Sequence, residues 1–97
     1  MFYRILILYS LGGFIVMSDI LKIRFDSIDK VKRFVSICTR SSCDVDVKSD
    51  RYIINGKSIM GIFSLDLTQV VDVIIHSDNI SDVDSLKLEL ESEGFTK

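Results

Sequence analysis

Apolar and polar residues alternate in three stretches of the chain. The alternation begins at residue 19 and recurs over residues 43–48 and 71–76. Successive side chains of a strand point to opposite faces of the sheet, so these stretches predict half-buried strands. A fourth strand is predicted at residues 52–55, where "YIIN" follows the turn residues "SDR". The polar residues of these strands should share one solvent-exposed face: Lys22, Arg24, Asp44, Asp46 and Asp72.

Three stretches with helical character separate or follow these strands. Over residues 28–41, apolar residues recur at three- and four-residue intervals, and Ser27 before them supplies an N-cap oxygen. A short helix is predicted at residues 58–65. A last helix should begin at Ser81, which has an acidic residue three positions on, the spacing of a capping box. The order β-α-β-β-α-β-α predicts an α+β fold, with a four-stranded antiparallel sheet and three helices on one face.

Length and composition indicate one small domain of ordinary globular type. The chain has 97 residues, of which 27% are charged and 47% hydrophobic, and it contains no proline. Its 12 basic and 14 acidic residues give a net charge of −2, which argues against a nucleic-acid-binding protein. Cys38 and Cys43 do not have the spacing of a metal site, so no metal is expected. Two buried thiols are the simplest interpretation of this pair, and a disulfide between them stays open.

Residues 1–16, "MFYRILILYSLGGFIV", differ from the rest of the chain. They carry one charge, at Arg4, and the uncharged run after it is shorter than the roughly 20 residues that a transmembrane helix needs. The run is similar to a signal peptide but has no small-residue cleavage site. We interpret residues 1–16 as upstream sequence read through, because Gly12-Gly13 can be the translated image of a purine-rich ribosome-binding site. Residues 17–97 would then be a single domain that starts at Met17; a membrane anchor is the alternative for residues 1–16.

The stretch "GKSIMGIFSLDL", residues 56–67, carries the most distinctive motif in the chain. It resembles the "KSIMG-x-x-SL" segment that opens the short second helix of HPr, the histidine-containing phosphocarrier of the bacterial sugar phosphotransferase system. The matching residues are Lys57, Ser58, Ile59, Met60, Gly61, Ser64 and Leu65. The resemblance continues in register through Phe34-Val35 and "DVDSLKLELE", and covers residues 19 to about 93. It implies the HPr-like open-faced sandwich.

The resemblance ends where the carrier chemistry of HPr is located. HPr proteins have "GLHARPAA" at the start of the first helix, whereas this chain reads "FDSIDKVK" there. Ser27 occupies the histidine position and Asp29 the arginine position. A serine phosphate is an ordinary ester rather than a labile phosphoramidate, and Asp29 would repel a phosphate. We therefore expect a divergent member of the family that lacks the carrier histidine, with His76 as a surface residue that matches no site of the family.

The motif serine has two interpretations. In HPr of Gram-positive bacteria a dedicated kinase phosphorylates it, so the resemblance implies that Ser58 is a regulatory phosphorylation site. From the residues alone, Ser58 can equally be the N-cap of the short helix, worth about 1 kcal/mol. A helix of about seven residues cannot bury all its apolar side chains on one face. We therefore expect Ile59, Met60 and Phe63 to form a partner-docking surface, with a place in the core as the alternative.

Together these inferences predict a cytoplasmic bacterial domain that regulates the phosphoenolpyruvate-dependent phosphotransferase system without phosphohistidine carrier activity. Its partners would be phosphotransferase-system or catabolite-regulation proteins, with a serine kinase acting on Ser58. The alternative is a non-canonical phosphocarrier that uses Ser27 or another nucleophile. No enzyme is expected, because the sequence has no evident Ser/His/Asp set, phosphate loop or metal cluster. No cofactor is expected, and no membrane contact apart from the anchor alternative.

Overall fold

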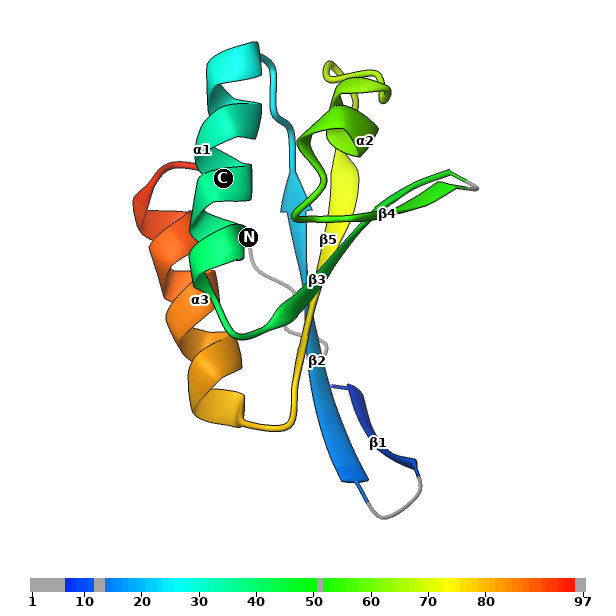
Figure 1. The fold of residues 1–97 in the computed structure, drawn as a ribbon, viewed down its shortest axis with the longest axis vertical. Coiled ribbons are helices and arrows are strands. Elements are labelled where there is room, and N and C mark those ends of the chain that lie inside the picture. The colour runs from blue at the N-terminus through cyan, green and yellow to red at the C-terminus, as the bar shows by residue number, and fades with distance from the viewer. Residues whose placement is uncertain (1–6, 12–13, 51, 96–97) are drawn as a thin grey trace.

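The protein is a single antiparallel sheet with helices packed against one side, as Figure 1 shows. The computed structural model describes residues 7–11, 14–50 and 52–95. Its elements are β1 (Ile7–Leu11), β2 (Phe14–Ile23), α1 (Ile28–Arg40), β3 (Asp44–Ser49), β4 (Tyr52–Asn55), α2 (Ile59–Phe63), β5 (Val71–Ser77) and α3 (Ile80–Ser92). From β2 onward the order is the predicted β-α-β-β-α-β-α, and the predicted fold class is confirmed.

The strands lie in the order β1-β2-β5-β3-β4, and all neighbours are antiparallel. Helices α1 and α3 lie side by side against one face of the sheet, while α2 contacts α1 and β4 near the N-terminal half of α1 (Figure 1). The other face carries the polar residues of the alternating strands, as predicted. On that face Lys22 and Asp72 stand opposite each other and form an ion pair of 2.7 Å.

The sheet has a fifth strand that the sequence analysis did not predict. Residues 1–16 were expected to precede the first strand, but the structure places Ile7–Leu11 in β1 and begins β2 at Phe14. The run is uncharged and almost entirely apolar or small, so it lacks the alternation that marks a half-buried strand. Residues 1–6 lie outside the described residues. The read-through origin of residues 1–16 stays a prediction.

The helix starts are set by side-chain oxygens. Ser27 caps α1 as predicted, with its Oγ accepting a hydrogen bond from the Lys30 backbone N–H at 3.2 Å. The cap of α3 is Asn79 rather than Ser81, because the Asn79 Oδ1 accepts the Ser81 backbone N–H at 2.9 Å. An amide oxygen caps as well as a hydroxyl does, so Asn79 takes the role that was predicted for Ser81.

The core lies between the sheet and the two long helices. Phe34 of α1 is fully buried at its centre, with its ring centroid 5.0 Å from that of Phe25 and 6.0 Å from that of Phe95, both edge-on. Such pairs contribute about 0.5–1.5 kcal/mol beyond the area they bury. The other buried apolar residues come from all layers: Leu21, Ile23, Val31, Ile37, Cys38, Cys43, Val45, Val47, Ile62, Val71, Val73, Ile75, Val83, Leu86 and Leu90.

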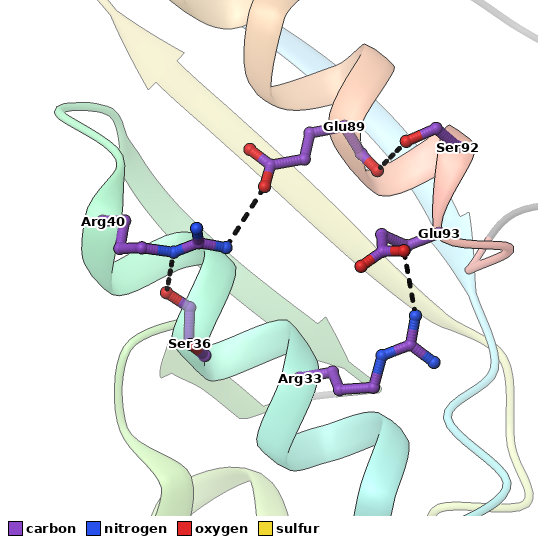
Figure 2. A network of polar contacts seen from close by, with 6 residues as sticks. All are labelled: Arg33, Ser36, Arg40, Glu89, Ser92 and Glu93. Atoms are coloured by element: carbon purple, nitrogen blue, oxygen red, sulfur yellow. Dashed lines mark hydrogen bonds and ion pairs between the residues drawn. The ribbon is translucent and has the colours of Figure 1, made fainter.

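Two ion pairs join α1 to α3 at the surface, as Figure 2 shows. Arg33 lies 3.1 Å from Glu93, and Arg40 lies 3.2 Å from Glu89. All four side chains are largely exposed, so each pair contributes no more than about 1 kcal/mol. The two arginines are about two helical turns apart on α1 and the two glutamates about one turn apart on α3, and the pairs favour the observed alignment of the two helices.

A charged pair also lies inside the domain, between the sheet and α3. Asp19 of β2 is completely buried, and the Lys87 Nζ of α3 is 3.5 Å from its Oδ2. The Asp19 Oδ1 accepts the backbone N–H of Ile20 at 3.0 Å. Removal of the Lys87 charge takes away a cation that compensates the buried Asp19 carboxylate, and breaking a buried charge pair is usually a large cost.

We expect Lys87→Met to lower the free energy of unfolding by about 3 kcal/mol or more. In a domain of this size the melting temperature should fall by more than about 10 °C. The matched control is Lys32→Met on the exposed face of α1, which should change stability by less than about 0.5 kcal/mol. Equal melting temperatures for the two variants, measured by circular dichroism, would contradict a stabilising role for the Lys87–Asp19 pair.

Candidate functional site

The motif residues 57–65 form the short helix α2 and its two ends. Ser58 is exposed and is the N-cap of α2, with its Oγ accepting the Gly61 backbone N–H at 3.2 Å. At the other end, the backbone N–H of Ser64 bonds to the Gly61 carbonyl at 3.2 Å. The cap interpretation of Ser58 therefore describes its local role. Its exposed hydroxyl also leaves it open to modification from solvent.

Two glycines allow the segment around Ser58 to approach the sheet closely. A Cβ on Gly61 would lie 2.6 Å from the Ile54 Cγ2 and 3.0 Å from the Ser58 Oγ. A Cβ on Gly56 would lie 2.6 Å from the Val45 Cγ1. Real Cβ atoms do not make contacts of 2.6 Å, so larger residues at either position would push the segment away from β3 and β4. These contacts fix where the sheet presents Ser58.

The predicted docking residues differ in exposure. Met60 is 75% exposed, whereas Ile59 and Phe63 are half-buried and pack against the core. Ile62 is the residue of α2 that is fully buried. A helix of five residues has one inward face, and Met60 points the other way. Of the three predicted docking residues, Met60 is therefore the main apolar contribution to the surface beside Ser58.

Lys57 is directed to a different part of the fold. Its Nζ donates to the carbonyl oxygen of Ser41 at 3.3 Å, at the C-terminal end of α1. This contact places a cation at the negative end of the helix dipole. Beneath it, burial raises the pKa of the Cys38 thiol to about 12, although the Lys57 ammonium opposes the shift. Cys38 and Cys43 are both buried free thiols, so the predicted state of the two cysteines is confirmed.

The two residues predicted to form a degenerate carrier position lie at the N-terminus of α1. Ser27 and Asp29 are both exposed there, and Ser27 is occupied as the helix cap. Asp26 before them has a left-handed φ of 66°, and its backbone N–H donates to the carbonyl of Leu67 at 3.0 Å. An acidic side chain in the first turn of a helix is stabilised by the helix dipole. That stabilisation explains Asp29 without any role in phosphate chemistry.

His76 lies far from that position. It stands near the end of β5, where it is opposite Ser18, whereas Ile23 near α1 is opposite Val71 at the other end of the strand. Five residues along a strand correspond to about 17 Å. His76 therefore cannot take the place of an imidazole beside Ser27.

A chain of polar contacts around His76 was missed by the sequence analysis. The Ser18 Oγ is 2.6 Å from the His76 Nδ1, and the His76 Nε2 is 3.1 Å from the Asp46 Oδ2. An ionised carboxylate only accepts, so Nε2–H donates to Asp46; in the neutral imidazole Nδ1 then accepts from the Ser18 hydroxyl. Ser18 is only 1% exposed, which keeps its hydroxyl away from any substrate. The contacts tie β2, β5 and β3 together, and only the strand register brings these distant residues into one place.

The described residues offer little else for chemistry. They contain no group of three or more His, Cys, Asp or Glu side chains placed to hold a metal ion. In the same part of the chain, no helix has the length and apolar character needed to cross a bilayer. In the loop after α2, the hydroxyl and the backbone N–H of Thr68 both donate to the Asp66 Oδ1. These hydrogen bonds lower the pKa of the Asp66 carboxyl.

One solved structure is similar to this chain: the crystal structure of HPr-C-His from Thermoanaerobacter tengcongensis. The two share 25% sequence identity with a TM-score of 0.56, over 73% of this chain and 88% of that one. The chain has an HPr-like fold. No protein-family model matches the sequence, and no curated protein does. The similarity supports a relation to the phosphotransferase system, as the motif in residues 57–65 suggested.

Gly61→Ala tests whether the close contact positions α2. Alanine usually stabilises a helix interior by about 1 kcal/mol relative to glycine. Here we expect a loss of about 1–3 kcal/mol, because the added methyl group would collide with Ile54. In an Ile54→Ala background the same change should be neutral or stabilising. A double-mutant cycle of urea unfolding measures this coupling, and additive effects would refute it.

Proposed function

We propose that the chain is an HPr-like regulatory and interaction domain of the phosphoenolpyruvate-dependent sugar phosphotransferase system, without phosphohistidine carrier activity. The observation that carries the proposal is the exposed Ser58 hydroxyl at the N-terminus of α2, next to the exposed Met60. A serine kinase would modify Ser58, and phosphotransferase-system or catabolite-regulation proteins would dock over α2. The domain would act in the bacterial cytoplasm, where such partners work.

Phosphorylation of Ser58 is compatible with the local structure. A phosphate carries about −1.5 to −2 charges at neutral pH, and free amides at a helix N-terminus stabilise an anion by about 0.3–1 kcal/mol. The Lys57 ammonium donates to the carbonyl oxygen of Ser41, so the fold does not rely on a contact between Lys57 and the Ser58 hydroxyl. The new charge would therefore alter the surface beside Met60 while the domain stays folded. An apolar partner would be repelled, and a partner that presents arginines would be recruited.

Ser58→Asp and Ser58→Ala test this regulatory role. We expect the aspartate variant to bind a partner recovered over α2 at least about tenfold differently from the alanine variant, because a charge beside an apolar contact is costly to desolvate. The aspartate variant should stay within a few degrees of the parent melting temperature, since aspartate also caps helices, whereas the alanine variant should lose about 1 kcal/mol, or about 4–8 °C. Lys32→Asp, on the exposed face of α1, controls for added negative charge. Equal binding by all three variants would reduce Ser58 to a helix cap.

The absence of carrier activity has a separate test. Incubation with the first enzyme of the phosphotransferase system and labelled phosphoenolpyruvate should leave the protein unlabelled, because Ser27 is a helix cap beside Asp29. Acid-labile label would favour the non-canonical phosphocarrier. The double change Ser27→His and Asp29→Arg should introduce labelling, whereas Ser27→His alone should give much less, because Asp29 would repel the phosphate.

A further inference from the structure

β1 and the first part of β2 form an N-terminal hairpin that extends beyond the rest of the sheet. β2 pairs with β5 only from Met17 to Ile23, whereas its first residues, Phe14–Val16, pair with β1 alone. Figure 1 shows the two strands projecting past the end of α3. A two-stranded ribbon without a third strand is at best marginally stable in water. This part of the fold therefore needs a partner more than any other described element.

The outer edge of β1 is suited to pair with another strand. Among the described strands, β1 pairs only with β2, so its outward N–H and C=O groups face no other strand of the sheet. Natural edge strands usually carry charged residues or proline, which prevent pairing. Neither Ile7–Leu11 nor Phe14–Val16 contains either kind of residue. The opposite edge, β4, has only four residues, and in the sequence Arg51 directly precedes it and Lys57 follows two residues after it.

We propose that β1 pairs with β1 of a second copy of this chain. Antiparallel pairing about a two-fold axis places Tyr9 opposite Tyr9 of the second copy, and Ile7 opposite its Leu11. Every neighbouring pair in the sheet is already antiparallel, so this contact continues the same pattern. A two-fold contact is self-complementary, because the same edge serves both copies. The two sheets then join into one, with both helix layers on the same side.

A second copy fits this edge better than a lipid bilayer does. The projecting residues, Ile7–Leu11 and Phe14–Val16, are uncharged, which a membrane would accept. However, unpaired backbone groups are costly in hydrocarbon, and an open strand edge is not tolerated there. Pairing with another strand satisfies those groups directly. The backbone thus favours a strand as the occupant, and the sequence of β1 can supply that strand itself.

Charge substitution at Tyr9 tests the contact in the full chain. Sedimentation should show a dimer for the parent protein. Tyr9→Lys and Tyr9→Asp should each weaken self-association at least about tenfold, since like charges directly opposite each other destabilise an antiparallel pair. An equimolar mixture of the two variants should restore the dimer. Tyr52→Lys, on the exposed part of β4 at the other edge, is the matched control and should leave the dimer unchanged.

A cysteine at the proposed axis gives an independent readout that does not depend on disrupting the hairpin. Tyr9→Cys should form a covalent dimer on mild oxidation. The Cα atoms of opposite residues in an antiparallel pair lie about 4.5–5.5 Å apart, a distance that a disulfide spans. Cys38 and Cys43 are buried and should not crosslink, and Tyr52→Cys serves as the control. A monomeric parent protein, or a dimer indifferent to Tyr9, would overturn the proposal. Flotation of the monomer with phosphatidylcholine–phosphatidylglycerol vesicles would assign the hairpin to a membrane instead.

Discussion

The antiparallel pairing of β5 with β2 on one side and β3 on the other is the constraint on which the rest of the structure depends. This register puts Leu21, Val73 and Val47 side by side on the covered face, and all three are buried. A shift of one residue would turn every one of these side chains to solvent. The same register aligns Lys22, Asp72 and Lys48 on the open face, with charges that alternate in sign. Burial on one face and charge alternation on the other thus select the same pairing.

The position of α2 follows from that pairing through two glycines. β4 is placed by its pairing with β3, and Ile54 of β4 touches the backbone of Gly61. Gly56 is held against Val45 of β3, and its N–H donates to the Val45 carbonyl at 2.7 Å. The site therefore depends on backbone contact with the sheet. The contacts of Gly61 with Ile54 and of Gly56 with Val45 do not involve the Ser58 side chain, so the proposed phosphate would leave them in place.

Much of this structure is predictable from local pattern, and the exceptions have physical causes. The alternation in residues 43–48 and 71–76 predicted β3 and β5, and Ser27 was identified as a cap because both features are local in sequence. β1 was missed because a run of mostly apolar and small residues has no clear period to distinguish strand from helix. The contact between Ser18, His76 and Asp46 was missed because it joins three strands and depends on register. The half-burial of Ile59 and Phe63 was also missed. It depends on which side of the five-residue helix α2 packs against the core, and the sequence of so short a helix does not determine that side.

The two proposed contact regions lie at opposite ends of β2. β1 pairs with the first residues of β2. The last residue of β2, Ile23, leads into the N-terminus of α1, beside which α2 lies (Figure 1). Ten residues of strand separate these ends by about 30 Å. Self-association through β1 would therefore leave α2 uncovered on both copies. A dimer of this form would present two Ser58 sites, and a partner with two binding modules could engage both with higher avidity than one. Regulation at Ser58 would then act on each half of such a contact, so the response to phosphorylation would be steeper than for a single domain.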